Sequence, residues 1–436
     1  MKRLLLAAAL WLAALPAVAA IDITEVTTPA GFHAWLVEEP SIPFVSLRLV
    51  FRGGTSLDAA DVQGATNLMT GLLEEGAGDL DAQGFAKARD DLAASFIFDS
   101  YDDAVTVSAR FLSDSTDQAT ALLETALAHP RFDPDAVERV REQVLSGLRS
   151  DAEDPNAIAG NAFSAKVFGD HPYGRPGEGT IDTVTALDRD DLIAAHKGAL
   201  ARDRVYIAAA GDISPDKLAE VIDKLMAELP ETGAPMPGEA SVDFDGGTDV
   251  VPFQTPQSVI LFGQPGIAMD DPDFFAAYLL NQILGGSGFS ARLMTEVREK
   301  RGLTYGIYSY LADKDHADLI VGRAGTANAR AGETISVVRD EWAKMAKEGP
   351  TAAELDQAKT YLIGAYPLRF DGNDDIATIL VGMQLDGLPA DYVNTRNDKI
   401  RAVTLDDVKR VAGELLQPGK LTFIVVGQPE GVTPGN

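Results

Sequence analysis

A concealed duplication constrains the fold of this chain more than any other feature of its sequence. Residues 191–211 have the pattern of a helix followed by an alternating strand that stops at a glycine, and residues 407–427 repeat that pattern 216 positions later. Upstream of each module a further helix start recurs at a similar distance, at residues 133–136 and 350–353. Two elements repeated in the same order predict two related domains within one chain.

Both halves mix alternating strand patterns, such as residues 45–50, with long amphipathic helical patterns, such as residues 117–128. The strict strand–helix–strand alternation of a parallel sheet is absent. We therefore expect an α+β fold in which each domain is a mostly antiparallel sheet with helices packed on one face. A stretch rich in Pro and Gly, without periodicity, predicts a linker at 230–253 between domains at 21–229 and 254–436.

The first twenty residues have the features of a secretory signal. Lys2 and Arg3 form a positive start, residues 4–15 are apolar but too short to span a membrane, and small residues precede a cut near Ala19 or Ala20. No later apolar run approaches spanning length. We therefore expect a periplasmic or otherwise exported protein without a membrane span.

Composition excludes several classes of function. The chain has no cysteine, which excludes disulfides, cysteine-based metal sites and a thiol nucleophile. Its 66 acidic residues against 37 basic ones give a net charge of −29, which repels phosphate backbones and argues against nucleic-acid binding. The acidic excess serves solubility, or it attracts basic substrates.

Several segments resemble one peptidase family. Residues 284–293 (Leu-Gly-Gly-Ser-Gly-Phe-Ser-Ala-Arg-Leu) and 296–305 (Glu-Val-Arg-Glu-Lys-Arg-Gly-Leu-Thr-Tyr) are similar to a glycine-rich turn and an Arg/Tyr segment of M16 peptidases. Residues 62–76 resemble the first helix of that family, and residues 171–176 resemble its loop after the long helices. The resemblance to this pitrilysin, insulinase and mitochondrial processing peptidase group covers nearly the whole mature chain. It implies the M16-like α/β roll in each domain.

The chain departs from the family at the zinc motif. The family pattern is His-x-x-Glu-His on a helix, with a further Glu about 76 residues downstream. The aligned residues here are Asn67, Thr70 and Gly71, and the downstream position falls near Gly147. A zinc site needs about three protein ligands, and this set offers no good one. The resemblance therefore implies that this chain binds no metal or other cofactor, with zinc expected in a partner subunit.

Substitute ligands are poorly supported by the sequence. None of the five histidines pairs with another at helical spacing; they are His33, His129, His171, His196 and His316. Glu74 either shares a face with the degenerate motif or belongs, with Glu75, to a solvated helix end. A stand-alone metallopeptidase with substitute ligands is thus the least favoured interpretation.

The Arg/Tyr segment is intact. A helical pattern over 291–301 ends at Gly302, after which Leu303, Tyr305 and Ile307 alternate as a strand. Because the chain reverses at the glycine, Arg298 and Tyr305 are expected to face one cleft. The resemblance implies that this pair holds the substrate backbone and stabilises the oxyanion opposite zinc. The alternative is a surface ion pair for Arg298 and strand packing for Tyr305.

The glycines of the turn have two interpretations. Gly285, Gly286 and Gly288 either belong to a flexible loop or form a hinge that lets a peptide backbone approach.

Members of this family occur as four-domain chains or as pairs of two-domain chains, in which one carries the zinc motif and the other the Arg/Tyr segment. The resemblance therefore implies a non-zinc subunit of an exported heterodimeric M16 metallopeptidase. Its partners would be a chain with His-x-x-Glu-His and an extended peptide substrate. The alternative is an inert M16-fold scaffold or peptide-binding protein.

Overall fold

The computed structural model describes residues 21–286, 288 and 290–435. The predicted signal segment, residues 1–20, lies outside the described residues and stays a prediction. Ser287 and Phe289 of the glycine-rich turn also lie outside them.

The N-terminal half is built on a six-stranded sheet. Its strands, in spatial order, are β1 (Thr24–Thr27), β2 (His33–Glu38), β8 (Val205–Gly211), β3 (Phe44–Arg52), β7 (Ala104–Leu112) and β6 (Ser95–Ser100). Only the β2–β8 pair is parallel among these strands. A small separate hairpin joins β4 (Gly76–Ala77) to β5 (Leu80–Asp81).

The C-terminal half repeats this sheet. Its strands, in spatial order, are β9 (Thr248–Pro252), β13 (Thr422–Gly427), β10 (Gln257–Pro265), β12 (Ala317–Ala327) and β11 (Thr304–Lys314). Here too only one pair, β9–β13, is parallel. Without β1, the two sheets have the same strand order and the same single parallel pair. This confirms the predicted α+β fold of two homologous, mostly antiparallel domains.

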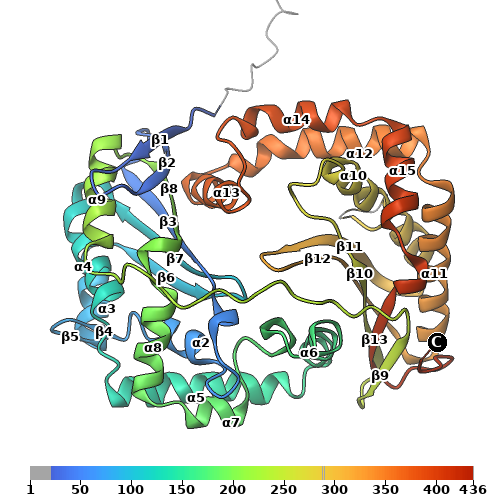
Figure 1. Ribbon diagram of the computed structural model, residues 1–436, viewed down its shortest axis with the longest axis horizontal. Helices are drawn as coiled ribbons and strands as arrows, with labels where there is room; N and C mark the ends of the chain where they lie inside the picture. Colours follow the sequence, from blue (N-terminus) through green and yellow to red (C-terminus); the bar gives the residue numbers. More distant parts are fainter. Residues whose placement is uncertain (1–20, 287, 289, 436) are drawn as a thin grey trace, which may run out of the picture.

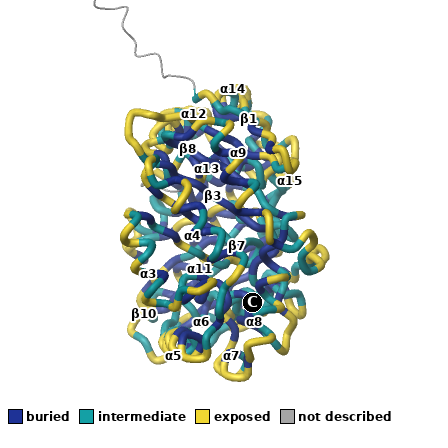
Figure 2. Tube along the Cα trace, turned by 90° about the vertical axis from the view of Figure 1, so that its left-hand side faces the viewer, coloured by how far each residue is buried: buried dark blue, intermediate teal, exposed yellow. Residues whose placement is uncertain are grey.

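Helices cover the outer face of each sheet or run along its upper or lower end in the view of Figure 1. In the N-terminal half they include α2 (Ala65–Thr70), α3 (Ala82–Asp91), α4 (Thr116–Ala128), α5 (Pro134–Asp151), α7 (Ile181–Ala186), α8 (Arg189–Ala199) and α9 (Pro215–Met226). In the C-terminal half they include α10 (Phe274–Leu284), α11 (Ala331–Glu348), α12 (Ala352–Ala365), α14 (Tyr392–Ala402) and α15 (Leu405–Leu415). Figure 2 shows buried positions concentrated in the strands and exposed ones in the loops.

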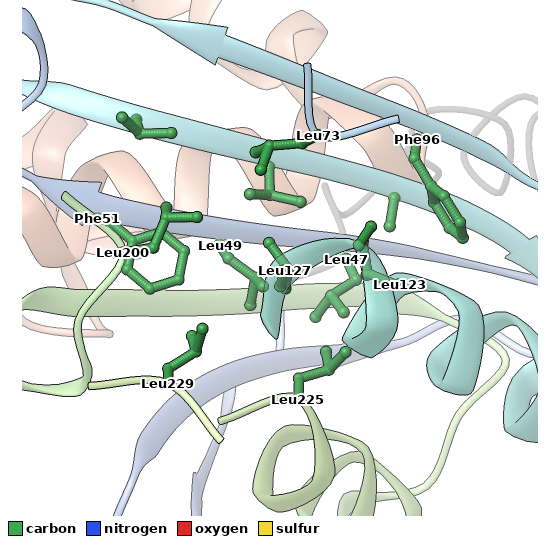
Figure 3. Close-up of a cluster of buried hydrophobic side chains, with 14 of the residues drawn as sticks. Leu47, Leu49, Phe51, Leu73, Phe96, Leu123, Leu127, Leu200, Leu225 and Leu229 are labelled. Carbon is green, nitrogen blue, oxygen red and sulfur yellow. The ribbon is translucent and has the colours of Figure 1, made fainter. Parts of the chain in front are cut away.

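Leucines dominate the N-terminal core. Leu47 and Leu49 of β3 face Leu123 and Leu127 of α4, and Leu225 of α9 completes the layer (Figure 3). All five are almost fully buried. At about 25 cal/mol per Å² of apolar surface, a leucine buried to this extent contributes roughly 2 kcal/mol. The core therefore holds α4 and α9 rigidly against the sheet.

The inner face of each sheet receives a helix from the other half. Helix α6 (Pro155–Phe168) of the N-terminal half packs its Phe163 against Val259 of β10 and Ile424 of β13. Helix α13 (Asn373–Leu385) of the C-terminal half packs Leu380 against β8 and β3. The two helices begin 218 positions apart, close to the repeat offset. Helices on one face of each sheet were expected. The second, inner face is covered as well, by a helix from the other half, and these two helices join the halves.

Among the described residues, no helix has both the length and the apolar composition to cross a membrane.

Candidate functional site

Helix α2, where the zinc motif would lie, is held at its start by a buried carboxylate. Asp58 accepts hydrogen bonds from the Gly64 N–H at 3.0 Å and from the Thr66 hydroxyl at 2.6 Å. Gly64 itself has φ +92°, a left-handed conformation that favours glycine. Burial raises the pKa of Asp58 to about 6. The helix is thus retained as a structural element.

The side chains at the motif positions do not fit a zinc ion. The Asn67 amide oxygen accepts a hydrogen bond from the Ser100 hydroxyl at 3.1 Å. The Thr70 hydroxyl is buried and donates to the Thr66 carbonyl within the helix at 2.7 Å. Gly71 caps the helix and has no side chain to coordinate a metal. Because the two polar groups already have partners inside the protein and neither is a good zinc donor, no catalytic step is assigned to a metal in this chain.

Gly147 lies on α5, as the alignment requires. A Cβ built on Gly71 would lie 3.3 Å from Val140 of α5, so the two helices touch there. Gly147 follows Val140 by seven positions, about two helical turns, and so lies on the same side of α5. The positions of Gly71 and Gly147 therefore lie on two helices that touch, and neither residue offers a metal ligand.

The two glutamates after α2 are paired with arginines. Glu74 accepts from Arg89 at 2.5 Å, and Glu75 forms an ion pair with Arg139. These ion pairs favour the interpretation of Glu74 and Glu75 as a solvated helix end over a role for Glu74 beside the degenerate motif. Each glutamate links the end of α2 to a neighbouring helix.

A cavity of about 550 Å³ adjoins Asn67. Its lining comes from both halves and is rich in carboxylates; it includes Thr55, Asn67, Ser100, Tyr101, Asp102, Asp103, Glu178, Asp313 and Lys314. The tip of the β11–β12 hairpin closes one side. There Lys314 pairs with Asp102 at 2.5 Å, and Arg52 of β3 pairs with Asp315 at 2.7 Å.

Gly285, at the start of the glycine-rich turn, lies against the edge strand β11. The Gly285 carbonyl accepts from the Ser309 N–H at 2.6 Å. A Cβ at Gly285 would lie 2.2 Å from the Ser309 hydroxyl, and one at Gly286 would lie 2.5 Å from the Gln282 side chain. Gly288 has φ +112°, and a Cβ built there would have nothing within 4 Å. Two of the three glycines are thus needed for close packing and the third for backbone conformation.

The structure brings Arg298 and Tyr305 together. Arg298 lies on a segment whose residues Met294–Glu299 form a π-helical turn, a widened turn that often occurs at functional sites. Gly302 follows with φ +60°, and its N–H donates to the Arg298 carbonyl at 2.9 Å. The chain then enters β11, and the Arg298 guanidinium carbon lies 5.1 Å from the centre of the Tyr305 ring.

Tyr305 does not share a face with its strand neighbours. Leu303 and Ile307 are buried, whereas Tyr305 is 89% exposed. The β11–β12 register shifts between Thr304 and Ile307, and this bulge turns Tyr305 outward. The simple alternation expected for this segment was therefore wrong at Tyr305, and so was the alternative in which Tyr305 packs in the strand.

Two further tyrosines extend this surface. Tyr308 and Tyr310 stack on each other at 6.4 Å between ring centres, and both are about half exposed. Arg323 of β12 lies directly opposite Tyr308. These residues are not among those predicted from the sequence, although the spacing of the tyrosines along β11 is a visible signal.

Comparisons with known proteins agree with this architecture. The family model "Insulinase (Peptidase family M16)" matches residues 34–181, and "Peptidase M16 inactive domain" matches residues 186–362. A crystal structure of a peptidase M16 inactive domain from Pseudomonas fluorescens has a TM-score of 0.87 and is 30% identical, covering 95% of this chain and 100% of that one. The chain belongs to the M16 peptidase family.

The curated M16 relatives carry two kinds of name. A protein described as a non-peptidase homolog, YmxG of Helicobacter pylori, is 25% identical over 93% of both chains. A protein described as an uncharacterized zinc protease of Streptomyces coelicolor is 26% identical, over 90% of this chain and 87% of that one. Because the two relatives are about equally similar to this chain, sequence identity does not separate peptidases from non-peptidases. The residues at the zinc-motif positions are the relevant difference. They support a non-catalytic M16-like member.

Proposed function

We propose that this chain is the non-zinc subunit of an exported heterodimeric M16 metallopeptidase. Its partner carries His-x-x-Glu-His and supplies the metal and the general base. This chain supplies Arg298 and Tyr305 and binds the extended peptide. The resemblance to an M16 inactive domain and to a non-peptidase homolog supports the non-catalytic part of this proposal.

The observation that carries the proposal is the presentation of Tyr305. An exposed phenol stacked against a guanidinium, on a strand that a bulge turns outward, has no role in the packing of this chain. A group from another molecule can reach it directly. By contrast, the helix α2 of this chain has lost every metal ligand while its fold is intact.

The chemistry of this pair follows from its donors. The Tyr305 hydroxyl donates a hydrogen bond to a peptide carbonyl oxygen, and this bond strengthens as negative charge develops on that oxygen. The Arg298 guanidinium beside it favours the same charge and donates to peptide carbonyls. Gly285 and Gly286 keep the turn close to β11, because a Cβ at either position would collide with its neighbours.

Reconstitution tests the proposal. The purified chain alone is expected to show negligible hydrolysis of quenched fluorescent peptides. Mixing it with an M16 chain from the same transcript that carries the full motif is expected to produce activity. Tyr305→Phe should reduce that activity by about 10²–10³-fold, whereas Tyr361→Phe, an exposed tyrosine on α12, should not. Zinc-dependent activity of this chain alone would overturn the proposal.

The second candidate is an inert scaffold or peptide-binding protein. The hydrogen bonds of Asn67 and Thr70 within the protein favour this candidate, because side chains at the motif positions then stabilise the fold rather than take part in catalysis. Arg298→Ala separates the two functions. A loss of hydrolysis with unchanged assembly supports the catalytic subunit, and a loss of assembly alone supports the scaffold.

Export is the remaining part of the proposal. The signal-like start at residues 1–20 supports a periplasmic or otherwise exported location. Fractionation of cells expressing the full chain, followed by N-terminal sequencing, tests it. A mature start near Ala20 or Ile21 in the exported fraction is the expected result.

A further inference from the structure

A second group of titratable side chains lies far from the cavity described above. Glu124 and His129 belong to α4 and its C-terminal cap, and Glu228 follows the end of α9. The candidate ligand atoms of these three residues all lie within 4.8 Å of one another. The His129 Nε2 lies 2.9 Å from a Glu228 carboxylate oxygen. One imidazole and two carboxylates in this proximity match the donor types that hold zinc in proteins.

The helices fix these three residues in place. Leu123 and Leu127 anchor α4 in the core, and Leu225 and Leu229 anchor the end of α9 against the same layer (Figure 3). The His129 carbonyl also accepts from the Gly78 N–H at 2.9 Å. Because the backbones are held on both sides, the three side chains need little reorganisation to meet one ion.

The local electrostatics favour a cation. Two carboxylates within 4.8 Å repel each other unless a positive charge lies between them. Both helices end at this point, and helix C-termini carry partial negative charge that adds to the field. The nearest other histidine, His196, is buried beneath and bonds the Leu127 carbonyl at 2.7 Å. Burial lowers the pKa of His196, so its neutral form does not neutralise the group.

We propose that Glu124, His129 and Glu228 form a binding site for a divalent transition metal such as Zn²⁺. Three protein ligands leave a position for water, as in an open zinc site. The site lies on helices that cover the face of the sheet turned away from the C-terminal half (Figure 1). The metal therefore has no part in peptide hydrolysis. It cross-links the ends of α4 and α9.

This group was not predicted from the sequence, for a physical reason. Two histidines at helical spacing are the usual signal of a zinc site, whereas this site needs one histidine and two glutamates. The third ligand comes 99 positions after His129 and meets it only because α4 and α9 pack side by side. The inference does not rest on the proposed function, and it revises the expectation that this chain binds no metal.

Calorimetric titration of the purified chain tests the site. The chain is freed of metal with a chelator and titrated with ZnCl₂ at slightly alkaline pH, with excess Mg²⁺ and salt to suppress binding by diffuse negative charge. One saturable zinc per chain is expected. His129→Ala and Glu228→Gln should each weaken binding by roughly 10–100-fold. His33→Ala, which removes an exposed histidine of β2, should leave it unchanged.

Two outcomes would overturn the site. One is the absence of saturable zinc binding. The other is equal zinc affinity in the wild type and in His129→Ala. Thermal unfolding with and without zinc gives an independent readout, because a bound cross-link raises the Tm of the wild type and not of the variants. Hydrolysis by the reconstituted mixture should not respond to His129→Ala, so failure here is distinguishable from failure of the proposed function.

Discussion

The guanidinium of Arg298 lies 5.1 Å from the centre of the Tyr305 ring, across the chain reversal at Gly302. The tyrosine is almost fully exposed, so this stacking contact restricts where its hydroxyl can lie. An unsupported exposed side chain samples several rotamers, and a catalytic donor must be held in one place. We therefore expect the two residues to act as one unit, in which Arg298 binds the peptide and also positions the Tyr305 side chain.

Arg298 and Tyr305 should show strong coupling in a double-mutant cycle. Because Arg298→Ala also frees the Tyr305 side chain, the double variant Arg298→Ala/Tyr305→Phe should lose much less activity than the product of the two single losses. Hydrolysis by the reconstituted heterodimer measures this. The free energy of unfolding should change little, since the tyrosine makes no core contact. Independent, multiplicative losses would contradict the shared role.

Gly285→Ala should destabilise the C-terminal half by about 1–3 kcal/mol. The new Cβ would lie 2.2 Å from the Ser309 hydroxyl and 2.9 Å from its backbone nitrogen, so the turn must move away from β11. Urea unfolding measures the loss. Gly364→Ala on α12, where nothing lies within 4 Å, is the matched control and should be neutral or slightly stabilising. Equal behaviour of the two variants would argue against a close-packed turn.

Glu354→Gln should reduce stability at neutral pH and have little effect in strong acid. Glu354 accepts two hydrogen bonds from Arg292, at 2.6 and 2.8 Å, and these lower its pKa from 4.5 to about 2. A lowered pKa contributes stability above the unfolded value, which is lost as pH falls from about 4.5 through about 2. With allowance for partial exposure, the contribution is roughly 1–2 kcal/mol.

Urea unfolding of the wild type and Glu354→Gln across that acid range checks the sign. The difference between them should shrink as pH falls. Glu25→Gln, which changes an exposed glutamate of β1 in the other half, serves as the control. A difference that grows toward acid would contradict the assigned pKa shift.

Lys314→Ala and Arg52→Ala should loosen the tip of the β11–β12 hairpin. These two cations pair with Asp102 and Asp315 across the boundary between the halves, and none of the four side chains is more than half exposed. Amide hydrogen exchange at residues 312–316 should accelerate, because the tip loses its anchors. Lys344→Ala on α11 should leave that exchange unchanged. Unaltered exchange in the double variant would show that backbone contacts alone hold the tip.

Patterns that repeat along the chain could be predicted from the sequence. The two modules ending at Gly211 and Gly427 predicted the duplication, and both glycines end equivalent central strands, β8 and β13. Gly302 was expected to reverse the chain, and it does so with positive φ. These features depend on short-range periodicity and on single glycines at chain reversals. Both can be identified in the sequence without knowledge of long-range contacts.

Features set by long-range packing could not be predicted. The apolar positions of α6 and α13 indicate that each helix is covered, but not which sheet covers it. The outward turn of Tyr305 depends on a bulge in the pairing of β11 with β12, and Gly306 within the shifted stretch is only a weak local signal of it. The proximity of His129 and Glu228 likewise follows from helix packing.

The exchange of α6 and α13 has a consequence for how this chain can be divided. Each half covers the inner sheet of the other, so either half produced alone would present a bare apolar surface to water. A single proteolytic cut between Pro230 and Phe253 would leave one particle made of two interlocked pieces.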